Sequence, residues 1–273
     1  MLDQILQIAR AAGAETLGYY RAGYDIHKKS DNSPVTCADL ASHRLIRDRL
    51  RALTPEIPIV SEESTPEEIR ARRAWPRLWL IDPLDGTKEF IKGSDEFAVM
   101  IALIEGGRPV LGVAHAPALG LSYYAERGAG AWRRRGDEPA ERIGVRKANL
   151  DRLAVVASRD HGGESLKRVL AKIPNGEVVR MGSALKICTV AEGRADIYLR
   201  IGNTSEWDVA AGQCIVEEAG GAVMTLDGAP LGYNDKEGLL NPSFMCVGDT
   251  AQPWTDIVAS WNEPDPKAAA TPA

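Results

Sequence analysis

The sequence of 273 residues predicts an α+β fold in two halves, and three features predict it. Two amphipathic helical patterns come first. A group of apolar segments separated by short turns follows, as in an antiparallel sheet. From about residue 150 onward, strand-like and helix-like segments alternate, which is typical of an α/β unit. We therefore expect an N-terminal half over 1–149 with an antiparallel sheet and an α/β half over 150–262.

The N-terminal half is expected to begin with two helices. In the first, apolar residues from Leu2 to Leu17 recur three or four positions apart, which indicates one buried face. The second follows Thr36, which forms a capping-box pattern with Asp39, and its apolar residues continue to Leu53. Strands are then predicted over 57–60, 78–81, 97–105, 109–116 and 121–125. Short turns with Gly or Pro separate the last three, which indicates an antiparallel meander.

The second half alternates between the two kinds of element. Strands are predicted over 153–157, 177–180, 195–199 and 222–225, and helices over 164–172, 184–192 and 209–219. This alternation predicts a more parallel sheet. Residues 263–273 are polar and rich in Ala and Pro, so we expect a disordered tail. No long linker separates the halves, and the active site is therefore expected in the seam between them.

The composition argues against several classes of protein. A net charge of −5 disfavours binding to a nucleic-acid polymer, which requires an excess of Lys and Arg. The four cysteines lie far apart without a C-x-x-C pair, so neither a zinc site nor a disulfide framework is expected, and a reduced cytoplasmic setting is favoured. No signal peptide and no apolar run long enough to span a bilayer is found. A homodimer and peripheral contact with the inner membrane stay open.

The most informative segment is the end of the strand predicted over 78–81. Asp82 and Asp85 follow it, Pro83 fixes the backbone between them, and Gly86 allows close approach of a ligand before a helix begins near Thr87. Mg²⁺ prefers hard oxygen ligands, and paired ions can hold the attacking and leaving oxygens of a phosphoryl group. Amides at the following helix start would bind phosphate oxygens. Alone, the segment fits an ordinary Asp-Gly turn equally well.

Two further acids lie at comparable positions. Glu62 follows the strand predicted over 57–60, and Asp208 lies at the start of the helix predicted over 209–219, so both can meet the first pair. Taken singly, Asp208 also fits a helix N-cap. Together, four acids from three segments indicate a multi-metal carboxylate site for phosphate ester hydrolysis.

Three motifs resemble the signature of the inositol monophosphatase superfamily. They are the Glu62-Glu63 pair, the Asp-Pro-Leu-Asp-Gly-Thr segment at 82–87 and the Trp207-Asp208 helix start. The continuation Lys-Glu-Phe-Ile at 88–91 is similar to the bacterial 3'(2'),5'-bisphosphate nucleotidases of the CysQ type, where inositol phosphatases usually have Thr-Asn-Phe. The resemblance covers residues 2 to about 247. It implies a layered αβαβα sandwich of the inositol monophosphatase and fructose-1,6-bisphosphatase type, with two or three Mg²⁺ ions.

The resemblance also implies a role for each metal ligand. One Mg²⁺ would be held by Glu62, Asp82 and the carbonyl of Leu84. A second would be held by Asp82, Asp85 and Asp208.

The attacking water and the substrate are assigned to further residues by the same resemblance. Thr87, hydrogen-bonded to Asp39, would orient and activate the water together with Glu62, although Asp39 also fits the capping box. A hydroxyl at Ser183 and a cation at Lys186 suit a second phosphate, but they also fit an N-cap and a solvated charge. The implied substrate contacts are Gly86, Thr87, Ser158, Arg159, His161, Ser183, Lys186 and Asp208.

The implied reaction is hydrolysis of the 3'-phosphate of 3'-phosphoadenosine 5'-phosphate (PAP) to AMP and phosphate, linked to sulfate assimilation. It would proceed by in-line attack of a water activated at the metal site. Inositol monophosphate or another sugar phosphate is the first alternative substrate. A catalytically silent metal- or nucleotide-binding protein is the alternative of another class. The departures from the family pattern, Ala184, Asn203 and Val209, bear on substrate preference rather than on metal chemistry.

Overall fold

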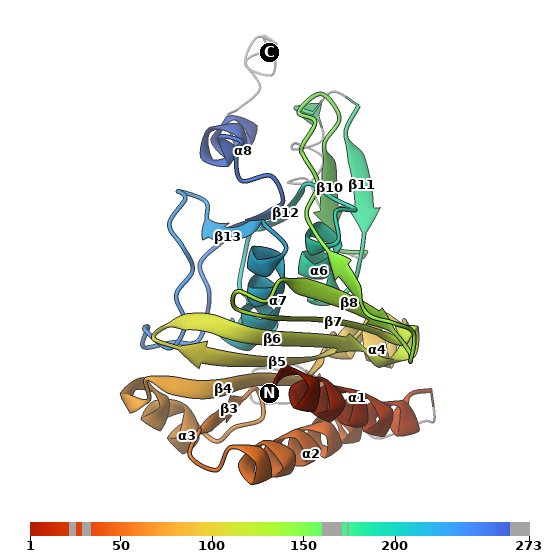
Figure 1. Cartoon of the computed structure of the whole chain (residues 1–273), viewed down its shortest axis with the longest axis vertical. Coiled ribbons are helices and arrows are strands. Elements are labelled where there is room, and N and C mark those ends of the chain that lie inside the picture. The colour runs from red at the N-terminus through yellow and green to blue at the C-terminus, as the bar shows by residue number, and fades with distance from the viewer. Residues whose placement is uncertain (22–25, 29–33, 160–170, 174, 263–273) are drawn as a thin grey trace, which may run out of the picture.

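The computed structural model describes residues 1–21, 26–28, 34–159, 171–173 and 175–262, and its elements form five layers (Figure 1). Helices α1 (Leu2–Tyr19) and α2 (Cys37–Leu53) cover one face of a seven-stranded sheet. Helices α6 (Leu185–Ala191) and α7 (Glu206–Glu218) separate it from a five-stranded sheet, which α8 (Trp254–Asn262) covers. This order confirms the predicted αβαβα sandwich.

The seven-stranded sheet confirms the predicted meander and extends it. Its strands, in spatial order, are β3 (Ile59–Ser61), β4 (Arg77–Asp85), β5 (Ala98–Glu105), β6 (Arg108–Ala116), β7 (Leu121–Glu126), β8 (Ala131–Arg135) and β9 (Glu141–Ile143). β3 is parallel to β4, and every other pairing in this sheet is antiparallel. Strands β8 and β9 were not predicted.

The five-stranded sheet is more parallel than the first, as predicted, but it contains a strand that was not predicted. Its order is β11 (Glu177–Arg180), β10 (Ala154–Ala157), β12 (Ile197–Arg200), β14 (Phe244–Val247) and β13 (Ala222–Thr225). β10 is parallel to β11 and β12, but β14 is antiparallel to β12 and β13. The sheet is therefore mixed, because the unpredicted β14 enters between β12 and β13. Most of the helix predicted over 164–172 and the whole tail at 263–273 lie outside the described residues.

Smaller elements complete the chain. They are β1 (Ile26–Lys28), β2 (Pro34–Thr36), α3 (Pro66–Ala71), α4 (Thr87–Ile91) and the 3-10 helices η1 (Arg72–Ala74) and η2 (Pro117–Leu119). Among the described residues, none of the helices has both the length and the apolar sequence required to cross a bilayer.

Strand β4 is buried on both faces, which explains its uninterrupted apolar sequence. Successive side chains of a strand point to opposite faces. Trp79 and Ile81 accordingly pack with α1 and α2, whereas Leu78 and Leu80 pack in the core that contains α6 and α7. A strand covered on both sides needs no polar alternation, and its first polar residue within the core is Asp82, which is 2% exposed.

Helix α7 packs directly against the backbone of β6. A Cβ added at Gly112 would lie only 2.4 Å from the carbonyl oxygen of Ala211, so a residue with a side chain does not fit there. Val209, Ala210 and Ile215 are buried in the core between the two sheets. This close packing brings the first turn of α7 to the seam between the sheets.

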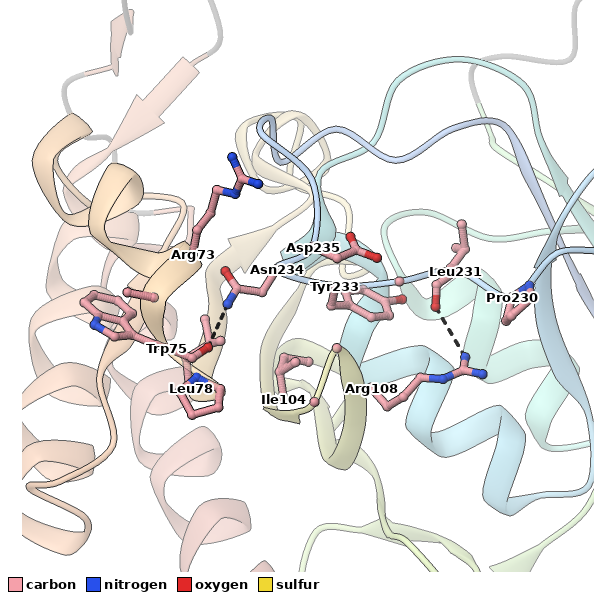
Figure 2. A pocket seen from close by; sticks show the side chains of 15 residues that line it. Arg73, Trp75, Leu78, Ile104, Arg108, Pro230, Leu231, Tyr233, Asn234 and Asp235 are labelled. Atoms are coloured by element: carbon pink, nitrogen blue, oxygen red, sulfur yellow. Dashed lines mark hydrogen bonds between the residues drawn. The ribbon is translucent and has the colours of Figure 1, made fainter.

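A loop near the first residues of β4 contacts the start of α7. A pocket of about 700 Å³ opens there among residues 73–76, the turn at 106–108 and loop 230–235 (Figure 2). The side-chain amide of Asn234 donates to the carbonyl of Trp75 at 3.0 Å (Figure 2). The backbone N–H of Asn234 donates to Glu206 Oε2, in the first turn of α7, at 2.8 Å. Loop 230–235 therefore ties α7 to the chain segment that leads into β4.

Candidate active site

A bulge at the end of β4 brings two acids together. Asp82 pairs with Met100 and Asp85 with Ala98, so β4 has one more residue than β5 between these pairs. Residues three apart on a regular strand point to opposite faces. The extra residue in the bulge allows Asp82 and Asp85 to point to the same side. Pro83 has no N–H for the ladder, and its carbonyl accepts from Ser42 Oγ of α2 at 2.7 Å.

Asp208 reaches the same place from α7. Its Oδ2 accepts the backbone N–H of Ser205 at 2.8 Å, so it stabilises the helix start from the third helical position rather than as the N-cap itself. The carboxylates of Asp82, Asp85 and Asp208 each offer an oxygen, and these oxygens lie within 4.8 Å of one another. The reading of Asp208 as the N-cap is therefore wrong, because Ser205 is the N-cap, but Asp208 completes the capping box and also meets the other acids.

Burial and mutual repulsion perturb all three carboxyl groups. Burial, with the negative charge of Asp85, raises the pKa of Asp208 to about 8. Burial raises the pKa of Asp85 to about 6, against the opposing effect of the Lys186 charge. Burial and the charges of Glu62, Asp85 and Asp208 raise the pKa of Asp82 well above its usual range. A divalent cation would offset this repulsion, and carboxylate oxygens are the ligands that Mg²⁺ prefers, so the three acids fit such an ion.

Glu62 lies beside the three acids without belonging to the 4.8 Å group. It follows β3, and its backbone N–H donates to the carbonyl of Ile81 on β4 at 3.2 Å. Its negative charge contributes to the raised pKa of Asp82, which places its carboxylate in the same electrostatic environment.

Thr87, Asp39 and Leu84 are joined by hydrogen bonds. Thr87 Oγ1 lies 3.3 Å from Asp39 Oδ1 and 3.3 Å from the carbonyl oxygen of Leu84. The other oxygen of Asp39 accepts from the backbone N–H of Thr36 at 2.8 Å and from its hydroxyl at 2.6 Å. The predicted capping box of α2 is therefore confirmed, and Asp39 binds Thr87 as well.

A pocket of about 190 Å³ adjoins the acids. Six of the residues predicted from sequence line it, namely Asp85, Gly86, Ser158, Ser183, Lys186 and Asp208. Gly86 has φ +89°, and a Cβ there would lie 3.0 Å from Cβ of Ser183, which explains the need for glycine at this close approach. The pocket therefore combines side chains from β4, from the turn before α6 and from α7.

Lys186 and Ser183 are both buried in the wall of this pocket. Lys186 Nζ donates to the carbonyl of Ser183 and lies 5.7 Å from the centre of the Tyr198 ring, so the reading as a solvated charge is wrong. Burial lowers the pKa of Lys186, and the charges of Asp85 and Glu89 oppose this shift. Ser183 has φ +50°, and its hydroxyl accepts the N–H of Leu185 at 3.3 Å, so it also stabilises the start of α6.

Arg200 and Tyr198 on β12 line the same pocket and were missed from the sequence. Nη2 of Arg200 donates to the carbonyl of Asn203 at 2.7 Å, whereas its Nε is buried without a hydrogen-bond partner among the described residues. The signal that applied to Asp82 also applies here, since Arg200 is a charged residue directly after a predicted strand.

Two other predicted contacts in the described part of the chain, Thr87 and Arg159, do not line the pocket. Arg159 Nε donates to Glu96 Oε2 at 2.6 Å, and its Nη2 pairs with the other oxygen of Glu96. It follows Ser158, which does line the pocket. His161 lies outside the described residues.

Comparison with known proteins gives a consistent result. A sequence model of the inositol monophosphatase family matches residues 1–254. The 3'(2'),5'-bisphosphate nucleotidase CysQ of Escherichia coli strain K12 is 46% identical over 250 residues, which cover 89% of this chain and 98% of that protein. The protein of the same name from Haemophilus influenzae is 38% identical over 259 residues, with coverage of 94% and 96%.

Solved structures agree with these relatives. The crystal structure of CysQ from Bacteroides thetaiotaomicron matches with a TM-score of 0.76 and 38% identity, covering 90% of this chain and 96% of that one. The IMPase of Thermotoga maritima matches with a TM-score of 0.79 and 30% identity, covering 95% and 97%. Since the family model spans most of the sequence and the relatives match over nearly their full length, the chain belongs to the inositol monophosphatase family.

Proposed function

We propose that the chain is a Mg²⁺-dependent phosphatase that removes the 3'-phosphate of PAP, releasing AMP and phosphate. The observation that carries the proposal is the convergence of Asp82, Asp85 and Asp208 beside a pocket that Lys186 and Arg200 also line. The acids fit divalent cations, and the two basic side chains fit the anionic groups of a phosphorylated substrate. The relatives named 3'(2'),5'-bisphosphate nucleotidase CysQ, at up to 46% identity, support a nucleotide bisphosphate as the substrate. PAP is a by-product of sulfate assimilation, where we place the reaction.

The metal chemistry is assigned to five residues. Two or three Mg²⁺ ions, when bound, would neutralise phosphate charge and lower the pKa of a water molecule. Their proposed ligands are Glu62, Asp82, the carbonyl of Leu84, Asp85 and Asp208.

The attacking water is assigned to Thr87 and Glu62. Asp39 Oδ1 lies 3.3 Å from the Thr87 hydroxyl and gives it a fixed direction, which supports a role in orienting the water. Since Asp39 is 1% exposed, its hold on Thr87 is shielded from solvent.

The substrate is assigned to the pocket side of the site. Gly86, Ser158 and Ser183 line it and would contact the phosphorylated nucleotide together with Thr87 and Asp208. Lys186 would bind the phosphate that is not cleaved. Arg159 and His161 remain assigned to the nucleotide by family resemblance.

A substrate panel tests the proposal. Phosphate release from PAP, AMP and inositol 1-phosphate is measured in Mg²⁺, with and without Li⁺. The second phosphate of PAP adds charge-assisted hydrogen bonds, so kcat/KM for PAP should exceed that for the others by one to several powers of ten. Equal use of inositol phosphate would overturn the nucleotide assignment and leave the phosphatase standing. Absence of phosphate release from every substrate would favour the silent binding protein.

We further propose that the enzyme acts in a reducing cytoplasm as a small-molecule hydrolase. Cys37, Cys188, Cys214 and Cys246 are free thiols, and burial raises the pKa of the last three, so they stay protonated and unreactive.

A further inference from the structure

Glu96 is a buried acid next to the active site with no role in the metal or substrate assignments. It lies between α4 and β5 and is 8% exposed. Its Oε2 accepts from Arg159 Nε at 2.6 Å and from the backbone N–H of Gly182 at 2.7 Å, and its Oε1 pairs with Arg159 Nη2. One carboxylate from the connection that leads into β5 therefore holds two segments of the C-terminal half.

We propose that Glu96 is a positioning residue for the uncleaved phosphate of the substrate, acting through Arg159 and the turn at 182–184. The inference rests on the proposed function, because it assigns Arg159 to the 5'-phosphate of PAP.

The pairing leaves Arg159 able to bind a second anion. A guanidinium has five N–H donors, and the side-on contact through Nε and Nη2 leaves both hydrogens of Nη1 and one of Nη2 directed away from Glu96. The Arg159 side chain is 53% exposed, and Ser158 beside it lines the pocket. Arg159 can therefore keep its contact with Glu96 and bind phosphate with its free edge. A guanidinium fixed in advance loses less conformational entropy on binding.

Glu96 also fixes the turn that carries the phosphate-facing groups. The N–H of Gly182 donates to Glu96 and the N–H of Ala184 donates to Asp85, so two acids hold the turn at both ends. Between them, Ser183 is held at φ +50°, a conformation that residues with a side chain adopt rarely, and its carbonyl accepts from Lys186. A change at Glu96 should therefore disturb Arg159 directly and Lys186 through Ser183.

The charge of Glu96 is suited to this task. Burial would raise the pKa of Glu96, but the hydrogen bonds from Arg159 and Gly182 outweigh burial and hold the pKa below its usual value. The group is therefore a carboxylate that can only accept hydrogen bonds. In Glu96→Gln, an amide NH₂ would replace one carboxylate oxygen. This NH₂ is itself a donor, so it could not accept the hydrogen bonds from Arg159 or Gly182.

The test compares PAP with adenosine 3'-monophosphate, which has the cleaved phosphate but not the 5'-phosphate. Glu96→Gln should raise KM for PAP by about tenfold to a hundredfold while kcat changes less than about threefold, since charge-assisted contacts to the uncleaved phosphate are lost. The kcat/KM for adenosine 3'-monophosphate should stay within about threefold. Calorimetric titration with AMP, which keeps the 5'-phosphate, should show a similar rise in Kd.

Asp196→Asn is the matched control. Asp196 is fully buried and accepts from Arg146 Nε at 2.7 Å, from Arg146 Nη2 at 2.6 Å and from the Ala154 N–H at 2.7 Å, the same pattern as Glu96, but it does not line the pocket. The Asp196→Asn variant should have a lower melting temperature than wild type and an unchanged KM for PAP. Equal losses for both nucleotides in Glu96→Gln, or an unchanged KM for PAP, would overturn the inference.

Arg159→Met provides a second variant at a half-exposed side chain, in case Glu96→Gln does not fold. It should raise KM for PAP as Glu96→Gln does, and the double variant should show little further rise because both act on one contact. An unaffected KM in Arg159→Met would also overturn the inference. A wild type that uses PAP no better than adenosine 3'-monophosphate would overturn the proposed function itself, and the inference with it.

Discussion

Single side chains in the candidate site make two kinds of contact at once. Asp39 completes the capping box of α2 and accepts from Thr87, and Asp208 stabilises the start of α7 and meets two other acids. Because each side chain makes two contacts, its position in the site is fixed before any ligand binds. It also means that helix starts and site geometry depend on the same residues.

Removing one acid from the cluster should lower the rate of catalysis much more than the stability of the folded protein. We predict that Asp85→Asn and Asp208→Asn lower kcat more than about 100-fold, because even outer contacts of metal sites are worth about 10 to 100-fold. The melting temperature of Asp208→Asn without metal should not fall, since this change removes repulsion between buried carboxylates. Steady-state kinetics and thermal unfolding measure both effects. Asp151→Asn, at an exposed residue, is the control, and activity within a few-fold of wild type in either folded variant would contradict the assignment.

Residues at strand ends could be predicted from sequence, whereas residues that act across the chain could not. Asp82 interrupts an apolar strand, and a charge at such a point is visible without a structure. Glu96 carries no comparable signal, because its partner Gly182 lies 86 positions away and no periodic pattern links them. Periodicity assigns a side chain to a face of its own element, and contacts between loops depend on tertiary packing.

At the scale of elements, the site depends on how closely α7 packs against β6. We predict that Gly112→Ala destabilises the protein by about 1–3 kcal/mol and lowers activity, because the new methyl group would displace the backbone of Ala211 and with it α7. Gly112 does not have a positive φ, so the effect would come from contact and not from backbone strain.

Gly18→Ala is the matched control for this change. Gly18 lies on α1 with open space at its Cβ, so the substitution should stabilise the helix by about 0.5 kcal/mol. Urea unfolding of both variants measures the difference. Equal stability of Gly112→Ala and wild type would show that α7 can move away from the sheet without loss.

The long elements were predictable because burial imposes a pattern on them. Helix α1 has one buried face, and β4 lies between two cores, so both show their environment in the sequence. Strand β9 has three residues and no buried ones, and β14 has four residues after an irregular stretch, so neither extends over enough positions to establish a period. The mixed direction of the second sheet follows from β14 and could not be predicted without it.

For the whole molecule, the site joins parts that the sequence keeps far apart. Asp82 and Asp85 belong to the seven-stranded sheet, and Asp208 belongs to the helix layer between the sheets. The proposed division near residue 150 falls between β9 and β10, yet one core cluster contains residues of both sheets, among them Leu80 and Val156. A cation held by these acids would therefore connect the two halves.

Magnesium should accordingly stabilise the folded protein as a whole. Only the folded chain brings the acids together, so Mg²⁺ at 100 times its Kd should add about 2.7 kcal/mol, or roughly 5–10 °C in melting temperature. The shift should shrink as the pH falls from about 8 through about 6, because the pKa of Asp208 is raised to about 8 and that of Asp85 to about 6, and protons then compete with the ion. Thermal unfolding in Mg²⁺ and in chelator, for wild type and for Asp208→Asn, measures this. The same melting temperature with and without Mg²⁺ in wild type would contradict a site between the layers.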